Sequence, residues 1–332
     1  MRRFRRIVAT PWRRPVNETD EAAALAASAK PADASIPASV SAIVVTYNAL
    51  PWIEPCLESV RGCELIVVDN GSGDGTPALV RERFPDARLI EQGNRGLGAG
   101  WNAGIEAAGG RWLFFLNADA WVVGDGIAKL VQVLEREPKA AVVGPRLRYP
   151  DGRPQRSVRG FPTLWRLATE YFFLRKLGPR TKLLNAFYGG GFRHDHELEA
   201  EFLMGAALLV RKDAVEQVGG LDERFFLFSE EVDWCYRFHQ AGWKVIFTPA
   251  AEAVHVGGAS HAGRFFREQV QGHLLFLDKH QGARTAAAAR RLLATALTLR
   301  GLVFKGERGR SYRDTARWLR SGSLEELLAW RR

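Results

Sequence analysis

An alternation of apolar runs and helix-like stretches between residues 40 and 120 restricts the possible folds most strongly. The β-branched runs at Val40–Val45 and Leu65–Val68 fit buried parallel strands, and the apolar parts of ARLIEQ and RWLFFLNADA fit two more. Helices are expected between these strands, at Pro51–Val60, Pro77–Arg83 and Leu97–Ala108. The pattern predicts an α/β fold, with a doubly wound, mostly parallel sheet and helices on both faces.

Polar residues follow three of these strands at the point where each strand ends. In doubly wound sheets, ligands bind beyond the carboxyl ends of the strands. The sequence therefore predicts a ligand site formed by Tyr47-Asn48, Asp69-Asn70, Asn117 and Asp119.

Two glycine-rich segments accompany these strand ends. DNGSGDGT follows the second strand and lacks the GxGxxG spacing, which argues against a dinucleotide fold and hydride transfer. NRGLGAGWNAG has more glycine than a helix usually tolerates. Close approach to a ligand and tight packing against the sheet would both explain its glycines.

The segment FFLFSEEVDWCYR places carboxylates directly after an apolar run, Phe225–Phe228. One interpretation is structural: Ser229 caps a helix, and the acids stabilise its positive N-terminal end. The other is chemical, because an apolar wall raises the pKa of a carboxylate and suits it to proton transfer. We expect both to hold, with Asp233 structural and one of Glu230 and Glu231 facing a reactant.

The cysteine count and the charge distribution indicate the compartment and the possible partners of the protein. The chain has 332 residues and three cysteines, an odd number without CxxC spacing, which favours a reducing compartment. The net charge of +10 is carried by the ends, since residues 283–332 hold 12 Lys/Arg against 4 Asp/Glu. A near-neutral middle argues against a nucleic-acid partner. The basic ends fit two interpretations, solvated tails that aid solubility and tails that contact an anionic membrane surface, on which RRLLATALTLRGLVF would lie as an amphipathic helix.

The same patterns suggest a division of the chain. Residues 1–39 are expected to form a disordered basic and Ala-rich tail, and residues 264–332 a helical basic extension. Between them, residues 40–263 are expected to form one domain. Its two halves would be 40–149 and 150–263.

Six segments in order resemble one known family. SAIVVTYN, IVVDNGSGDGT, NRGLGAGWNAG, LFFLNADA, the stretch from FLMGAALLV to WKVIFTP, and AVHVGGAS are similar to those of family-2, GT-A-fold glycosyltransferases, most of all the bacterial rhamnosyltransferase-like branch. The resemblance covers about residues 41–261, and it implies that 40–149 is a nucleotide-binding half and 150–263 an acceptor and catalytic half. It implies a GT-A type sheet, a nucleotide diphosphate sugar donor, inversion at the anomeric carbon, and a divalent metal, Mg²⁺ or Mn²⁺.

The resemblance also implies roles for particular residues. The metal would be held by Asp119, the last residue of the Asn117-Ala118-Asp119 counterpart of the family's DxD element, and by His255. Glu231 would be the base, in a position where Asp is usual, with Glu230 as the alternative. The nucleotide sugar would be bound by Val45, Tyr47, Asn48, Asp69, Asn70, Asn94, Asn102 and Asn117.

We therefore expect an inverting transferase that moves a sugar, with L-rhamnose from dTDP-rhamnose as the leading candidate. The acceptor would be a hydroxyl of a lipid-linked or polysaccharide glycan, at the cytoplasmic face of a membrane. The alternatives are another hexose or deoxysugar from a UDP-, dTDP- or GDP-linked donor, and a catalytically weak sugar-nucleotide-binding subunit. The last is motivated by Asn117, which stands where the DxD element has its first acid.

Overall fold

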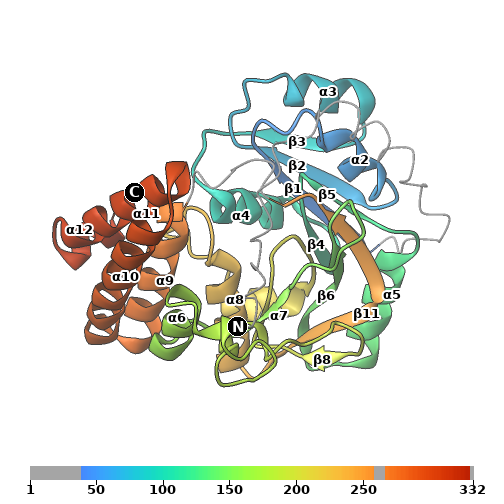
Figure 1. Ribbon diagram of the computed structural model, residues 1–332. Coiled ribbons are helices and arrows are strands. Elements are labelled where there is room, and N and C mark those ends of the chain that lie inside the picture. The colour runs from blue at the N-terminus through green and yellow to red at the C-terminus, as the bar shows by residue number, and fades with distance from the viewer. Residues whose placement is uncertain (1–38, 258–265, 330–332) are drawn as a thin grey trace.

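The computed structural model describes residues 39–257 and 266–329 (Figure 1). The expected N-terminal tail thus lies outside the described residues except for Ser39, and so do the last residues of AVHVGGAS. The strands are β1 (Val40–Thr46), β2 (Glu64–Asp69), β3 (Arg88–Glu91), β4 (Trp112–Asn117), β5 (Ala120–Val122), β6 (Ala140–Arg148), β7 (Val158–Arg159), β8 (Leu198–Glu199), β9 (Phe202–Leu203), β10 (Ala207–Arg211) and β11 (Lys244–His255).

Helices connect and cover these strands. Those within the first 257 residues are α2 (Ile53–Glu58), α3 (Thr76–Arg83), α4 (Leu97–Ala107), α5 (Gly126–Arg136), α6 (Leu164–Tyr171), α7 (Lys212–Val218) and α8 (Glu230–Gln240), with the 3₁₀ turns η1 (Leu174–Lys176) and η2 (Ala186–Tyr188). After them come α9 (Phe266–Gln281), α10 (Ala283–Val303), α11 (Gly306–Arg320) and α12 (Leu324–Leu328).

The main sheet has nine strands in the order β3-β2-β1-β4-β10-β6-β11-β5, with β8 paired to β11. Six strands, β1 to β4, β6 and β11, run in one direction, while β10, β5 and β8 run antiparallel to their neighbours. The predicted mostly parallel, GT-A type α/β fold is confirmed. The antiparallel β10 inserts between β4 and β6 and brings the second half of the chain into the sheet.

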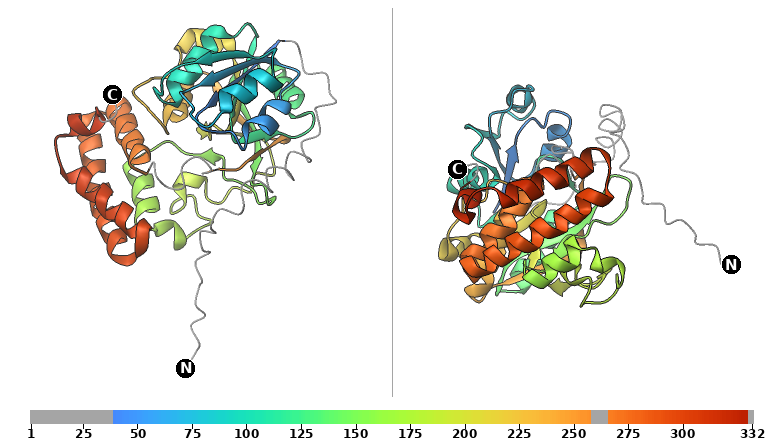
Figure 2. Two further views of the ribbon diagram at one scale, coloured as in Figure 1. Left: turned by 90° about the horizontal axis from the view of Figure 1, so that it is seen from above. Right: turned by 60° about the vertical axis from the view of Figure 1, so that its left-hand side comes forward.

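Helices cover both faces of this sheet, and alternate residues of β1 point to opposite faces. Ala42 and Val44 pack into a core shared with α2, α3 and α5. Ile43 and Val45 pack into a second core that runs through α4, α7 and α8 into the C-terminal helices. The C-terminal helices gather on one side of the molecule, away from α2 and α3 (Figures 1 and 2).

The C-terminal helices confirm the expected helical ending, but most of the amphipathic segment faces inward. Leu293 and Leu297 of α10 are fully buried, and α10 packs against α6, α9 and α11. Large apolar side chains of α10 are exposed only toward its end, at Leu299, Leu302 and Val303, with exposed fractions of 50%, 76% and 72%. In the described ranges, we find no helix with the length and hydrophobicity needed to span a bilayer.

Candidate active site

The carboxyl ends of β1, β2 and β4 meet at one edge of the sheet, as the sequence predicts. Strand β1 lies between the other two, with Thr46 beside Asp69 and Val45 beside Asn117. The register follows from three parallel strands that each bury a β-branched or aromatic run. It gathers the predicted polar residues of three separate segments at a single edge.

Asp69 organises the glycine-rich turn after β2. Its Oδ2 accepts hydrogen bonds from the backbone N–H groups of Gly71 and Ser72, at 3.0 and 2.8 Å. Asn48 joins this turn to the end of β1, since its Oδ1 accepts a bond from the Gly73 N–H at 2.8 Å. The other carboxylate oxygen of Asp69, Oδ1, is buried without a hydrogen-bond partner in the described chain. A buried acceptor of this kind suits a donor group on a ligand.

The predicted asparagines differ in what remains available for a ligand. Asn70 uses its amide within the protein, donating to the Gly96 carbonyl and accepting from Gln92. Asn102 bonds to both backbone groups of Leu221, at 2.8 and 2.9 Å. It therefore secures the segment before α8, away from the strand ends.

The other predicted nucleotide-site residues lie closer to the surface. Asn94 is exposed, and its Oδ1 accepts a bond from the Gly96 N–H. Tyr47 is exposed and follows the end of β1, while Val45 is buried beneath it. These residues thus lie at or beside the strand ends, where the nucleotide is expected.

The glycines of α4 answer the question left open by the sequence. A Cβ on Gly100 would come within 2.7 Å of the Val45 side chain, and one on Gly104 within 2.3 Å of Ile43. Packing of α4 on β1 therefore requires both glycines. At Gly96, where φ is +96°, a Cβ would lie 2.3 Å from the Phe226 carbonyl oxygen. These glycines bring backbones together, and no ligand is needed to explain them.

The turn before α8 sets the position of the two glutamates. Phe228 and Ser229 both have left-handed backbones, with φ of 69° and 74°, which is rare for residues other than glycine. On one side the Leu97 N–H donates to the Phe226 carbonyl at 2.9 Å, and on the other Gly272 of α9 packs against Phe228 and Ser229. The prediction that the Ser229 side chain caps the helix is wrong. Ser229 is the N-cap residue, but its backbone conformation comes with no side-chain capping bond.

Glu230 and Glu231 occupy the first turn of α8 in different surroundings. Burial, and then the charge of Glu231, raise the pKa of Glu230 well above its usual range. Burial also raises the pKa of Glu231, but backbone N–H groups, including that of Gly205, and the positive charge of Arg159 oppose that rise. Each side chain has a buried Oε2 without a hydrogen-bond partner among the described residues. Glu231 is thus the carboxylate more easily ionised, and it suits proton acceptance.

The wall around Glu231 is aromatic and close-packed. A Cβ on Gly205 would lie 3.0 Å from the Trp101 ring and 3.5 Å from Cγ of Glu231, so this glycine makes room for both side chains. Trp101 packs against Phe115, and Phe115 packs edge-on against Trp234. Of the predicted wall Phe225–Phe228, only Phe225 is buried, so the apolar surroundings of Glu231 come mainly from Trp101 and the rings packed on it.

Asp233 is structural, as expected. It is fully buried and accepts bonds from Arg237 of its own helix and from Lys279 and His280 of α9, at 2.7 to 2.9 Å. Burial alone would raise the pKa of Asp233, but the bonds from His280 and Lys279 outweigh it and lower that pKa. Asp233 therefore ties α8 to the C-terminal helices.

The two predicted metal ligands lie side by side. The antiparallel pairing of β5 with β11 sets His255 opposite Ala120, and His255 Nε2 lies 3.4 Å from Asp119 Oδ1. Gln155 makes two bonds to His255: its amide N–H donates to the His255 carbonyl, and its Oε1 lies 2.9 Å from Nδ1. In the neutral tautomer that donates from Nδ1 to Gln155 Oε1, the lone pair of Nε2 is free on the side of Asp119. This arrangement fits a divalent cation, with Gln155 in an orienting role.

Neither Gln155 nor Arg159 was predicted as a site residue. Both lie in the irregular region after residue 150, where no periodic pattern or motif singles them out. Across residues 39–257 and 266–329, no group of three or more His, Cys, Asp or Glu side chains could hold a metal by itself. Phosphate oxygens of a bound donor would have to complete the coordination of any ion at Asp119 and His255.

Comparison with known proteins agrees with this geometry. The sequence model described as glycosyl transferase family 2 matches residues 41–197. An N-acetylglucosaminyl-diphospho-decaprenol L-rhamnosyltransferase of Mycobacterium tuberculosis is 33% identical over an alignment of 261 residues. The match covers 72% of this chain and 84% of that protein. This likeness extends well beyond the residues matched by the family model.

Two solved structures share the fold. A mannosyltransferase from Pyrobaculum calidifontis, in complex with GDP-Man and Mn²⁺, covers 94% of both chains with a TM-score of 0.52 and 18% identity. GalNAc-T7 with UDP, GalNAc and Mn²⁺ covers 88% of this chain and 56% of its own, with a TM-score of 0.54 and 12% identity. With the motif order, the fold and the mycobacterial relative in agreement, this chain belongs to glycosyl transferase family 2 and is a glycosyltransferase of its rhamnosyltransferase-like branch.

Proposed function

We propose that the enzyme transfers a sugar with inversion, using Glu231 as the base that takes the proton of the acceptor hydroxyl. The observation that supports this is the pair of unequal carboxylates at the start of α8. Glu230 is buried and its pKa is raised by burial and by its neighbour, which favours its protonated form. Glu231 lies beside Arg159 and the Gly205 N–H, which favour its ionised form. A single base is sufficient for an inverting transfer.

The donor is proposed to be a nucleotide diphosphate sugar, with dTDP-rhamnose as the leading candidate. The nucleoside would lie at the ends of β1 and β2, where the buried Oδ1 of Asp69 can accept a bond from a ribose hydroxyl or a base N–H. Asp119 and His255 would hold Mg²⁺ or Mn²⁺. Such an ion would neutralise the charge of the diphosphate leaving group. Other hexoses or deoxysugars on UDP, dTDP or GDP remain the competing donors.

The acceptor is proposed to be a lipid-linked or polysaccharide glycan at the cytoplasmic face of a membrane. The mycobacterial relative, by its name, acts on a decaprenol-linked sugar, and 84% of its length is covered. The end of α10 supports peripheral contact, because exposed Leu302 and Val303 lie close to basic residues such as Lys305 and Arg308. The three free cysteines fit a reducing compartment.

A donor screen followed by a transfer assay tests this function. Thermal shift with dTDP-rhamnose, UDP-glucose and GDP-mannose, each with Mn²⁺ or with EDTA, identifies the donor, since a ligand bound to the native state raises Tm. NMR of the product then reports the anomeric configuration. Retention of configuration, or full transfer activity in both Glu231→Gln and Asp119→Ala, would refute the mechanism. Binding without transfer to any acceptor would favour a sugar-nucleotide-binding subunit instead.

A further inference from the structure

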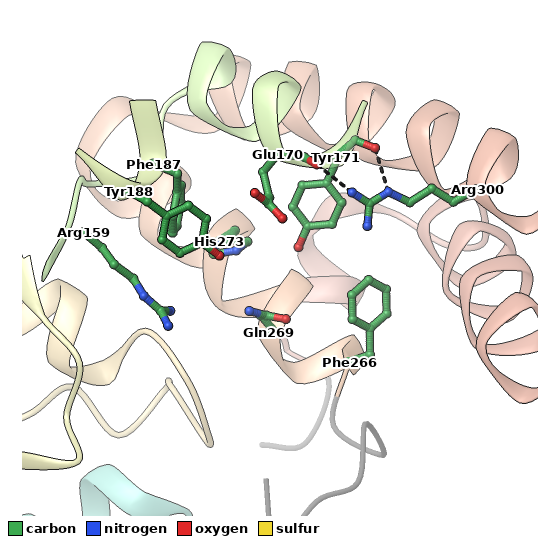
Figure 3. A pocket seen from close by; sticks show the side chains of 9 residues that line it. All are labelled: Arg159, Glu170, Tyr171, Phe187, Tyr188, Phe266, Gln269, His273 and Arg300. Carbon is green, nitrogen blue, oxygen red and sulfur yellow. Dashed lines mark hydrogen bonds between the residues drawn. The ribbon is translucent and has the colours of Figure 1, made fainter. Parts of the chain in front are cut away.

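A cavity of about 80 Å³ lies between α6, η2 and the C-terminal helices (Figure 3). We propose that it binds the diphosphate of a lipid-linked acceptor, so that the acceptor is held by its anionic linkage as well as by its sugar. This inference rests on the proposed function and adds to it the place and chemistry of acceptor recognition. A water needs about 10–15 Å³ of such space, so the cavity can admit groups several times that size.

Two guanidinium groups give the cavity uncompensated positive charge. Figure 3 shows Arg159 reaching toward it from β7 and Arg300 from α10 on the opposite side. Arg159 donates to the Arg156 carbonyl, and Arg300 to the carbonyls of Glu170 and Tyr171. Within the described part of the chain, neither has a carboxylate at ion-pair distance. Since buried charge is costly unless it is paired, these groups favour an anion between them.

The carboxylate at the cavity wall does not provide that compensation. Glu170 is paired with Arg175, whose Nε lies 2.6 Å from its Oε2. Around the neighbouring Tyr188 ring, the guanidinium carbons of Arg156, Arg159 and Arg175 all lie at 5.5 to 5.7 Å from the ring centroid. Among the residues that line the cavity, Glu170 is the carboxylate and is already paired, which leaves the charges of the Arg159 and Arg300 guanidinium groups. A diphosphate carries the charge needed to balance them.

His273 supplies a second, independent sign of a missing ligand. It lines the cavity, is 7% exposed, and its Nδ1 is buried without a hydrogen-bond partner among the residues described. Burial, and then the charge of Arg159, lower the pKa of His273 to about 4, so its ring is neutral at physiological pH. A neutral imidazole can donate one hydrogen bond to a phosphate oxygen without adding a charge that must be balanced.

Arg159 connects the cavity to the reacting group. It lies opposite Phe202 in the pairing of β7 with β9, and Gly205, three residues after Phe202, packs against Glu231. An acceptor anchored by its diphosphate at Arg159 would thus place its first sugar beside Glu231. On α10, Leu302 and Val303 follow Arg300 within a turn and are exposed, which gives the lipid chain an apolar path to the membrane surface.

The first test compares two acceptors that carry the same glycan. One is linked to a polyprenyl diphosphate and the other is an uncharged alkyl glycoside. We expect Arg159→Gln to lower the ratio of kcat/KM for the diphosphate acceptor over the neutral one at least tenfold. Arg193→Gln removes the same charge from a side chain that is 87% exposed, and it should leave the ratio unchanged. An unchanged ratio in Arg159→Gln overturns the inference while leaving the proposed function intact.

The second test measures binding without catalysis. Calorimetry in EDTA, with an Asp119→Ala background to remove the proposed metal site, compares farnesyl diphosphate, inorganic pyrophosphate and dTDP. Binding of farnesyl diphosphate that Arg159→Gln abolishes and Arg193→Gln retains supports the inference. Binding of pyrophosphate or dTDP but not of farnesyl diphosphate overturns it in favour of a site for released phosphates. This assay remains informative even if no sugar transfer is found.

Discussion

Substituting Glu230 by glutamine should mainly change stability, whereas substituting Glu231 by glutamine should mainly lower activity. Glu230 is 3% exposed, and its pKa is raised by burial and by the neighbouring carboxylate. Because its folded pKa exceeds its unfolded pKa, the folded state binds the proton more tightly. The contribution of Glu230 to stability is therefore fully present below its unfolded pKa and is lost as the pH rises from there to the folded pKa.

The size of this effect follows from proton linkage. Between the unfolded pKa of Glu, about 4.3, and its folded pKa, each pH unit costs the wild type about 1.4 kcal/mol. Glu230→Gln keeps the shape of the protonated side chain but does not titrate. The variant should equal the wild type near pH 4 and become increasingly more stable above it. Urea unfolding of both proteins from pH 4 to pH 8 measures the difference.

The kinetic part of the prediction separates the two residues. Glu231→Gln removes the proposed base and should lower kcat by about 10²- to 10⁴-fold, whereas Glu230→Gln should lower it less than tenfold. The wild-type kcat/KM should rise with pH through the pKa of Glu231, which burial raises above the ordinary range of glutamate. Parallel stability curves for wild type and Glu230→Gln, or a greater loss of kcat in Glu230→Gln than in Glu231→Gln, would refute this assignment.

Three further predictions concern the metal site and the backbone. Asp119→Asn should abolish Mn²⁺-dependent stabilisation by the donor, as seen by thermal shift with and without EDTA. Gln155→Leu should weaken Mn²⁺ affinity about 10- to 100-fold by releasing His255, and titration of activity against Mn²⁺ checks this; equal affinities would exclude the orienting role. Gly96→Ala should destabilise the fold by about 1–3 kcal/mol in thermal melts, since φ is +96° and the new Cβ meets the Phe226 carbonyl. Gly73 has open space around it, so Gly73→Ala should be near neutral in the same measurement.

Much of the first half of the fold could be predicted because its signals are local. Each buried strand of this half is a continuous apolar run, and each run ends in polar residues that the parallel register then gathers. The predicted starts and ends of α3 and α4 differ from the observed bounds by no more than a residue. Strand β10 is also an apolar run, but its direction depends on tertiary pairing with β4 and β6, which no periodic pattern encodes.

The second half illustrates what sequence alone does not provide. His255 and Asp119 are 136 positions apart, and only the pairing of β5 with β11 brings them together. Gln155 and Arg159 lie in a stretch of short strands and turns, where a residue's surroundings are set by distant helices. The family resemblance suggested the residues proposed to bind the metal and to act as the base. It did not supply the residues that orient the histidine or modulate the base.

The apolar side of α10 was predicted, on one interpretation, to face a membrane, but most of it faces other helices of the protein. The segment RRLLATALTLRGLVF does carry an apolar stripe, and most of it packs against α6, α9 and α11. Hydrophobic periodicity indicates which face is buried but not what buries it. Packing against three neighbouring helices buries most of this stripe, whereas Leu302 and Val303 at the end of the helix are exposed.

The left-handed turn at Phe228 and Ser229 also limits how this enzyme can be recombined. The turn is held by Gly96 from the nucleotide half and by Gly272 from the C-terminal helices, so its geometry depends on two distant parts of the chain. A chimaera that grafts the helices of another transferase onto this sheet must keep a residue without a side chain at 272. Otherwise the glutamates shift although every residue of the catalytic half is retained. In evolution as in engineering, acceptor specificity and the alignment of the base would then change together.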